Sequence, residues 1–238
     1  MDLSEKRIII IGGSSGIGLA IARAAALEGA TILIAGRSQE RLQSALQSIQ
    51  GRAEGIYLDV SSEESVQTFF SNIGSFDHLA TPGSSVHPGG CLHLETAKAR
   101  ESFDSKFWGQ YFAAKYGAPQ IRPGGSIVLF SGVLGHRPLP ETATIAAVNG
   151  AIEAFGRALA LEIAPIRVNT ICAGYVDTPL FAKLTEKERE ALFDQLSKEL
   201  LVKRIGLPEE IAETALYLMS NNYTTGSTIF VDGGFMLR

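Results

Sequence analysis

RIIIIGGSSGIG, at Arg7–Gly18, is the stretch from which the rest of this 238-residue sequence is best interpreted. Four consecutive isoleucines followed at once by spaced glycines predict a buried parallel strand, a tight turn and then a helix. In such a turn Gly12 lets the chain reverse, Gly16 lets backbone approach a pyrophosphate, and Gly18 lets helix and strand pack closely. The free amides at the start of the helix would hold the anion. An ordinary strand-to-helix turn is the alternative, but the order of strand, turn and helix favours a dinucleotide site.

The composition predicts a globular protein with a large core. The chain is 45% hydrophobic with a net charge of −4, and its charges are scattered, so we expect neither a nucleic acid nor a membrane surface as partner. The two cysteines, Cys91 and Cys172, have neither metal-ligand spacing nor a disulfide framework. The start MDLSEKR lacks the apolar region of a signal peptide, and no apolar run is long enough to span a membrane. We therefore expect a cytoplasmic protein without a metal that acts on a small molecule or binds a protein.

Segments with the patterns of strands and helices alternate along the whole chain. Further strands are predicted at 31–36, 55–60, 76–81, 124–132, 166–174 and 228–234, and helices at 19–30, 39–50, 61–74, 96–117, 142–164 and 208–220. This order predicts an α/β fold with a single doubly wound, Rossmann-like parallel sheet, helices on both faces, and one domain over residues 1–238. The charged segment 175–206 is expected to be helical and to form a mobile flap over a ligand.

The residue after the second strand indicates which dinucleotide is bound. An acidic side chain at this point would accept hydrogen bonds from the adenosine ribose. Here Gly36 is followed by Arg37, which can pair with a 2′-phosphate instead. The sequence therefore favours NADP(H) over NAD(H), unless Arg37 is only a solvated loop charge.

Several stretches together resemble the short-chain dehydrogenase/reductase family over essentially the whole chain. They are GGSSGIG, Leu58-Asp59-Val60, GSIV, ALALEIAPIRVNTICAGYVDTP, RIGLPEEIA and TGSTIFVDGG. The resemblance implies that Asp59 and Val60 contact the adenine, and that Val176 and Thr178 contact the nicotinamide amide and the phosphates. It also implies a homo-oligomer, a dimer or tetramer, built through the two long helices and the final strand. The predicted cofactor-binding residues are Gly12, Ser14, Ser15, Gly16, Ile17, Gly18, Arg37, Ser38, Asp59, Val60, Gly83, Val176 and Thr178.

The catalytic positions of the family carry other residues in this chain. Alignment on ALALEIAPIRVN places the family's tyrosine on Ile145, its lysine on Asn149, its serine on Gly132 and its asparagine on Lys106. The family's tyrosine gives or takes the hydroxyl proton and its lysine lowers the pKa of that tyrosine, and an isoleucine can do neither. The sequence is thus expected to be a divergent member that keeps the cofactor half and lacks the usual Asn-Ser-Tyr-Lys set.

Three interpretations of this pattern remain open. In the first, catalysis is rearranged: Lys106 and Asn149 exchange the family's asparagine and lysine, and Ser131 or Tyr175 donates the proton. In the second, the chain is a catalytically inactive cofactor-binding protein, either regulatory or the partner of an active homologue. In the third, it is a reductase whose substrate or water supplies the proton. The first predicts a catalytic set of Lys106, Ser131, Asn149 and Tyr175.

Other titratable residues are weaker candidates for the proton donor. Tyr111 and Lys115 form a Tyr-x3-Lys pair, but on the wrong helix, and an unbroken helix would not let both Lys106 and Tyr111 face the site. Histidines could act as acids near neutral pH, and His136 is better placed than His87 or His93. Cys91 is expected to be buried rather than reactive.

Overall fold

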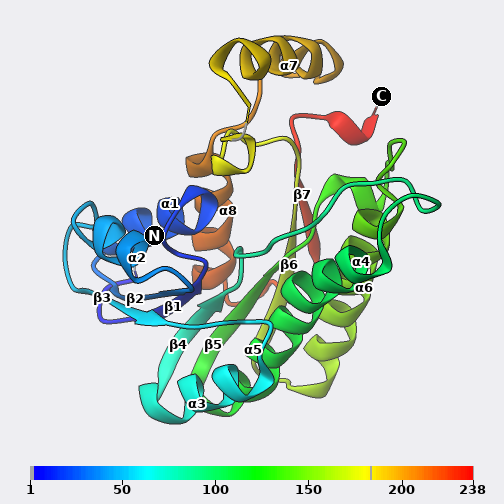
Figure 1. Cartoon of the computed structure of the whole chain (residues 1–238). Helices are drawn as coiled ribbons and strands as arrows, with labels where there is room; N and C mark the ends of the chain where they lie inside the picture. Colours follow the sequence, from blue (N-terminus) through cyan, green and yellow to red (C-terminus); the bar gives the residue numbers. More distant parts are fainter. Residues whose placement is uncertain (1–2, 183, 238) are drawn as a thin grey trace.

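The sheet is the centre of the computed structural model, which describes residues 3–182 and 184–237 (Figure 1). Seven strands pair in parallel in the order β3-β2-β1-β4-β5-β6-β7. Their bounds are β1 Arg7–Ile11, β2 Thr31–Gly36, β3 Ala53–Tyr57, β4 Phe76–Ala80, β5 Ile121–Phe130, β6 Arg167–Ala173 and β7 Thr228–Val231. The predicted doubly wound α/β fold is confirmed.

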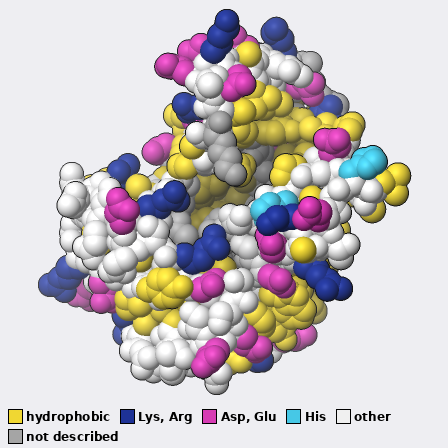
Figure 2. Space-filling model, in the orientation of Figure 1, with side chains coloured by type: hydrophobic (Ala, Val, Ile, Leu, Met, Phe, Trp, Pro, Cys, Tyr) yellow, Lys and Arg dark blue, Asp and Glu magenta, His cyan; other side chains and the backbone are white. Residues whose placement is uncertain are grey.

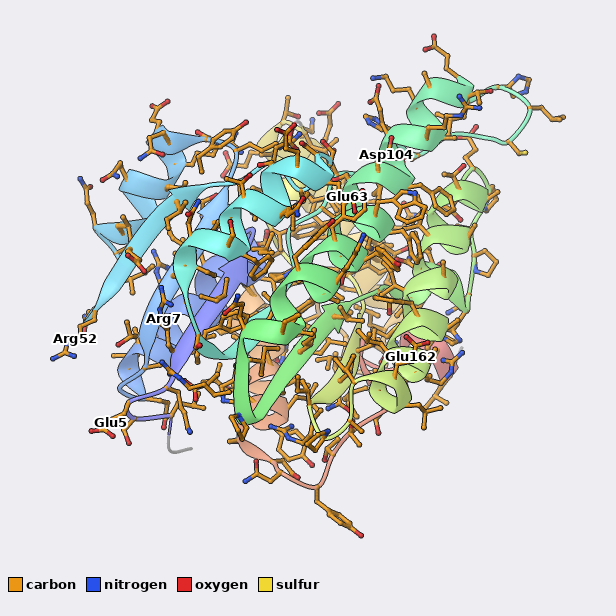
Figure 3. All side chains as sticks on the ribbon, turned by 90° about the horizontal axis from the view of Figure 1, so that it is seen from below. Glu5, Arg7, Arg52, Glu63, Asp104 and Glu162 are labelled. Carbon is orange, nitrogen blue, oxygen red and sulfur yellow. The ribbon has the colours of Figure 1, made fainter. Side chains whose placement is uncertain are left out.

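Most helices lie in two layers, one on each face of the sheet, and α7 stands apart from both. The helices are α1 Gly16–Leu27, α2 Gln39–Leu46, α3 Glu63–Ile73, α4 Thr96–Phe103, α5 Gly109–Gly117, α6 Ala143–Glu162, α7 Glu186–Glu199 and α8 Pro208–Ser220. Figure 3 shows one layer from below, with Glu63 at the start of α3, Asp104 beyond the end of α4 and Glu162 at the end of α6. Among the described residues, no helix is both long and apolar enough to span a bilayer.

The isoleucines of β1 explain how one strand supports both layers. Ile8 and Ile10 point into a core shared with α1 and α8, and Ile9 and Ile11 point into a second core shared with α3, α5 and α6. Successive side chains of a strand face opposite sides, so a strand buried on both faces needs an unbroken apolar run. That run is what the sequence shows at its start.

Several element boundaries differ from the sequence prediction; among them, the helix expected at 96–117 is interrupted by a π-helical segment, Asp104–Trp108. Two other differences concern α2 and β3. The second helix ends at Leu46 rather than Gln50, and β3 covers 53–57 rather than 55–60. Leu58, Asp59 and Val60 therefore follow β3 as a loop. Since ligand sites of parallel sheets lie beyond the carboxyl ends of the strands, this shift places Asp59 and Val60 where a ligand could reach them.

The charged segment after β6 forms a helix that stands beyond the sheet. Helix α7 projects past the ends of the strands (Figure 1) and buries none of its residues. Its start is fixed by a capping box between Thr185 and Glu188, and Arg189 forms an ion pair with Asp177. The helical content is confirmed, while the expected motion of a flap stays a prediction.

Candidate functional site

The carboxyl ends of β1 and β4 meet where the order of the sheet reverses. The amide of Gly83 donates to the carbonyl of Ile11 at 2.9 Å, and a Cβ on Gly12 would lie 2.2 Å from the Gly83 Cα. Gly12 also has φ +87°, which L side chains rarely adopt. At this point the crevice in which doubly wound sheets bind dinucleotides is therefore lined by the main chain of Gly12 and Gly83, with no side chain from either.

The glycine turn presents the start of α1 without a side chain in the way. Ser15 occupies the N-cap position, but no side-chain hydrogen bond caps this helix. The first amides of α1 are thus available to an anion. Gly16, with φ +51°, faces Thr178, whose Cβ would be 3.3 Å from an added Cβ. The two loops predicted to hold phosphates therefore lie against each other.

Around this turn, Gly18 and Ser14 are placed as their predicted roles require. A Cβ on Gly18 would lie 2.2 Å from the Gly12 carbonyl oxygen, so only glycine fits there. The Ser14 hydroxyl lies beside Gly36, the last residue of β2. Ile17 packs on the core under α1.

The loops after β2 and β3 carry the other predicted cofactor residues. Arg37 is exposed directly after β2, while the Ser38 hydroxyl accepts a hydrogen bond from the Arg41 amide and caps α2. Asp59 accepts hydrogen bonds from the amide and the hydroxyl of Ser61. Val60 packs where Gly109 leaves room for it. The Ser38 hydroxyl is thus occupied in capping α2, whereas the exposed Arg37 side chain could contact a ligand.

A π-helical segment, Asp104–Trp108, joins α4 to α5 and carries Lys106. Its position is fixed by Gln110, whose amide nitrogen donates to the Lys106 carbonyl at 3.1 Å and to the Phe130 carbonyl at 3.0 Å. The Gln110 carbonyl oxygen accepts from the Thr81 hydroxyl and the Phe130 amide, both at 2.8 Å. One buried amide thereby holds Lys106 against the ends of β4 and β5. Single π turns inside helices are frequent at functional sites.

Lys106 and Asn149 contact each other directly. The ammonium donates to Asn149 Oδ1 at 2.7 Å and lies 3.5 Å from the carbonyl oxygen of Ser131. Burial lowers the pKa of Lys106 from 10.5 to about 8, opposed by the charges of Cys172 and Glu153. The pair predicted to be exchanged between two helices therefore forms one part-buried cation–amide contact, and Lys106 is half-buried rather than a fully exposed surface lysine.

The residues around Asn149 leave room for its amide. Gly132 follows β5, and a Cβ on it would lie 3.2 Å from Asn149 Nδ2. A Cβ on Gly135 would lie 2.9 Å from the Asn149 Cβ. Ile145, one turn before Asn149 on α6, is only 9% exposed. These neighbours pack around an amide, and none of the three brings an acidic or basic group.

Beside this pair, Ser131 is joined to a buried carboxylate. Its hydroxyl donates to Glu153 Oε1 at 2.7 Å, and Glu153 Oε2 lies 2.6 Å from Nε2 of His136. Glu153 is 3% exposed, whereas the His136 side chain is 37% exposed. Cys172 on β6 lies alongside, with its sulfur within 4.8 Å of the ligand atoms of His136 and Glu153. Burial raises the pKa of the Cys172 thiol to about 12.

Tyr175 packs in a small apolar core and has no hydrogen bond to Lys106 or Asn149 among the described residues. Its ring packs edge-on against Phe235, with ring centroids 5.3 Å apart, in a small core with Val133, Cys172 and Leu200. Burial raises the pKa of Tyr175, which makes it a weaker acid. Val176, the next residue, is buried and forms a bridge with Gly206.

The remaining candidates are placed away from Lys106. Tyr111 packs against Phe155 in an aromatic cluster between α5 and α6, and Lys115 is paired with Glu63 at 2.8 Å, so the Tyr-x3-Lys match is a packing and surface feature. The imidazole of His87 pairs with Glu101. The prediction that Cys91 is buried is wrong: it lies exposed in the loop before α4, because this proline- and glycine-rich loop runs over the surface.

Two functional candidates, Gln110 and Glu153, were missed by the sequence reasoning. Glu153 has a signal that could have revealed it, since it falls on the apolar stripe of α6 together with Ile145, Val148 and Ile152. A carboxylate at a core position needs partners and therefore suggests a site. Gln110 has no such signal, because amides are common on helices.

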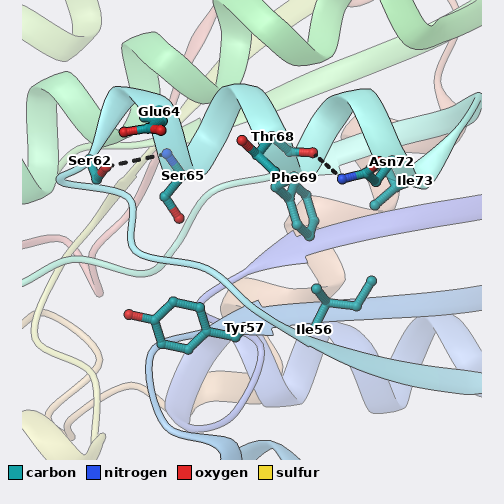
Figure 4. A pocket seen from close by; sticks show the side chains of 9 residues that line it. All are labelled: Ile56, Tyr57, Ser62, Glu64, Ser65, Thr68, Phe69, Asn72 and Ile73. Atoms are coloured by element: carbon teal, nitrogen blue, oxygen red, sulfur yellow. Dashed lines mark hydrogen bonds between the residues drawn. The ribbon is translucent and has the colours of Figure 1, made fainter.

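The cavities of the described surface differ in their distance from the predicted site residues. One of about 280 Å³ is lined by Tyr175, Val176 and Phe230 among others. Figure 2 shows hydrophobic side chains gathered below α7, where this face is hollowed. Another cavity, of about 460 Å³, lies between β3 and α3, where Ile56 and Tyr57 face Phe69 (Figure 4). It is separate from Lys106 and holds no cluster of reactive groups.

Comparisons with known proteins agree with this geometry. A family model described as Enoyl-(Acyl carrier protein) reductase matches residues 12–236. The short-chain dehydrogenase/reductase ATR9 of Stachybotrys chlorohalonatus is 35% identical, with 97% of each chain covered. The short-chain dehydrogenase/reductase ucsE of Acremonium sp is 31% identical, with 99% of this chain and 97% of that one covered.

A solved structure extends the likeness to three dimensions. It is described as a small-chain dehydrogenase in complex with NADPH, is 35% identical and has a TM-score of 0.87, with 99% of this chain and 100% of that chain covered. With a matching family model and relatives above 30% identity over nearly the whole chain, the chain belongs to the short-chain dehydrogenase/reductase family.

Proposed function

We propose that this oxidoreductase uses NADP(H) to reduce a carbonyl or oxidise an alcohol of a small molecule, with a non-standard site. The observation that carries the proposal is the part-buried contact of the Lys106 ammonium with the Asn149 amide oxygen, 2.7 Å long. Bringing a lysine out of water is costly. A chain that had lost all use for this site would have little reason to keep that lysine on a π segment held by Gln110.

The residues of the crevice fit a phosphorylated dinucleotide. Gly12 and Gly83 approach each other so closely that a Cβ on either would clash with the backbone of the other. The start of α1 has no side-chain cap, and Arg37 is exposed directly after β2. The NADPH complex of the 35% identical structure supports the same cofactor. When bound, NADP(H) donates or accepts the hydride.

The side chains around Lys106 can then stabilise the charge on the substrate oxygen and supply its proton. The Lys106 cation stabilises negative charge that develops on the substrate oxygen, and Asn149 orients that cation. The proton comes from Ser131 rather than Tyr175, because Ser131 adjoins Lys106 and its hydroxyl is bonded to the carboxylate of Glu153, whereas the Tyr175 ring packs against Phe235. This assignment keeps Lys106, Asn149 and Ser131 and leaves Tyr175 as a packing residue.

A catalytically inactive cofactor-binding protein is the second candidate. It is favoured by Ile145, an apolar side chain 9% exposed at the position aligned with the family's tyrosine. Under this alternative NADPH binding would regulate contact with another protein, and the Lys106–Asn149 pair would hold the cofactor without chemistry.

Titration and turnover separate the two candidates. We expect NADPH fluorescence to change on binding, and NADPH oxidation to follow with a panel of ketones, aldehydes and quinones. Lys106→Met should lower kcat by about 10²-fold or more, whereas Lys98→Met, on the exposed face of α4 and paired with Glu101, should not. Binding without turnover on any substrate would favour the inactive protein, and absence of binding would refute both.

We also propose that the chain is a single domain that forms a homo-oligomer. The family model spans residues 12–236 as one unit, and a shallow apolar cavity of about 420 Å³ lies between α5 and α6, lined by Tyr111, Phe155 and Leu159 among others. Trp108, the last residue of the π segment, and Leu161 on α6 are exposed, as expected of an interface. Light scattering of the purified protein should give a multiple of 25.4 kDa.

A further inference from the structure

The contact between Glu153 and His136 links the interior of the site to the surface. Glu153 is buried on α6 and uses both carboxylate oxygens, Oε1 for the Ser131 hydroxyl at 2.7 Å and Oε2 for the His136 ring at 2.6 Å. Ser131 lies at the end of β5, and its backbone carbonyl faces Lys106. The contacts thus run without a gap from Lys106 to His136, whose ring is 37% exposed and packs on Phe230.

Removing an ionised carboxylate from water costs free energy, so a buried Glu153 requires an explanation. A well-packed apolar side chain at position 153 would cost less than a carboxylate held out of water. A purely structural carboxylate would also have no need of a partner that reaches the solvent. Glu153 instead connects a hydroxyl inside the site with an imidazole, the side chain best suited to exchanging protons near neutral pH.

A bound metal ion is the other use for such a cluster, since His136, Glu153 and Cys172 converge. Two features argue against it. Metal binding needs a thiolate, and burial raises the pKa of the Cys172 thiol to about 12. Both Glu153 oxygens are already engaged with hydrogen-bonding partners, so an ion would have to break these contacts.

We propose that His136, Glu153 and Ser131 form a proton path that replaces the tyrosine of the family, carrying a proton from the surface to the substrate oxygen. The inference rests on the proposed oxidoreductase function. In the direction of reduction, the carbonyl carbon accepts the hydride and its π bond breaks, leaving the electron pair on oxygen. That oxygen takes the proton of the Ser131 hydroxyl, to which the Glu153 carboxylate is bonded. The His136 imidazolium gives its Nε2 proton to the Glu153 carboxylate, and the carboxyl group so formed passes a proton to the Ser131 alkoxide, which restores the hydroxyl and the carboxylate. Water returns a proton to His136, so one carbonyl, one NADPH and one proton give one alcohol and one NADP⁺.

The path makes a first prediction for the protein without cofactor. The ring N–H at Nε2 of His136 should give a strongly downfield, slowly exchanging proton signal by NMR, because the N···O distance to Glu153 is 2.6 Å. Glu153→Ala should abolish this signal. His93→Gln, at an exposed position outside the cluster, should leave it unchanged. A signal unaffected by Glu153→Ala would refute the contact on which the path depends.

Turnover of two substrate classes tests the path itself. Ketone reduction leaves a strongly basic oxygen that needs a proton, whereas quinone reduction gives a stabilised anion that does not. Glu153→Gln, which keeps the size of the side chain but blocks relay, should lower kcat for ketones by about 10²-fold and change kcat for quinones little. His136→Ala should slow ketone reduction, and added imidazole should restore part of it. NADPH affinity should stay unchanged in both variants.

The outcomes distinguish this inference from the function beneath it. Equal loss with ketones and quinones would show a structural role for Glu153 and refute the path while leaving the oxidoreductase function intact. Loss of turnover on chelation, restored by Zn²⁺, would refute it in favour of a metal site. A wild-type protein that binds NADPH but reduces neither class would refute the proposed function and the path together.

Discussion

The buried lysine predicts a specific change of stability with pH. Burial lowers the pKa of Lys106 from 10.5 to about 8. Because one pKa unit corresponds to about 1.4 kcal/mol, the charged form costs the folded state about 3 kcal/mol. Below pH 8 Lys106 is charged in both states and the whole cost is present. Between about pH 8 and 10.5 only the unfolded state holds the proton, so stability rises with pH.

Lys106→Met isolates this effect from every other titrating group. The variant also leaves Asn149 Oδ1 without its 2.7 Å partner, which costs about 1–3 kcal/mol at every pH. We therefore expect the free energy of unfolding of the wild type, minus that of the variant, to be constant below pH 8. It should rise by about 3 kcal/mol up to about pH 10.5 and then level off.

Urea denaturation followed by circular dichroism, at a series of pH values, measures this difference. Asn149→Leu provides a check, since it removes the acceptor but keeps the lysine. A difference that stays flat across the whole range would show that Lys106 is solvated in the folded state. A difference that falls with rising pH would mean that the site stabilises the cation, and either result would refute the burial argument.

Three further predictions concern the cofactor crevice and the rejected candidates. Arg37→Ala should weaken NADPH binding by about 10-fold or more, since a charge-assisted hydrogen bond is lost, and should leave the Kd of NADH nearly unchanged, as fluorescence titration would show. Gly12→Ala should abolish NADPH binding in the same titration and lower Tm, because its Cβ would lie 2.2 Å from the Gly83 Cα. Tyr111→Phe and Lys115→Met should keep kcat within about threefold of the wild type in NADPH oxidation assays, because changes away from the site usually have small effects. A large loss of kcat would show that the Tyr-x3-Lys pair is catalytic after all.

Much of the fold followed from local patterns. The isoleucine run at the start of the chain, the glycine turn and the alternating segments were sufficient for the parallel sheet, because apolar periodicity and turn chemistry act over short distances. The bond between Lys106 and Asn149 was anticipated only through alignment, since 43 residues separate them. The π segment and the amide of Gln110 that hold Lys106 depend on tertiary contacts and had no local signal. The cytoplasmic location, the absence of nucleic acid and the homo-oligomer stay predictions.

Errors in the sequence reasoning also have physical causes. Cys91 is exposed because its loop is rich in glycine and proline and has little core to pack against. Tyr175 follows the expected strand, but its ring packs onto Phe235, and the direction of a side chain in a loop is set by such contacts. Loops therefore carry the least readable part of a site.

The close approach of Gly12 and Gly83 limits how this crevice can change during evolution. Most packing conflicts can be relieved by shrinking a neighbour, yet both partners here are already the smallest residue, and each backbone meets the other. No second substitution at the opposite position can rescue the first. A mutational library aimed at new cofactor specificity should therefore hold both glycines fixed and place its diversity in the loops that begin at Arg37 and Asp59.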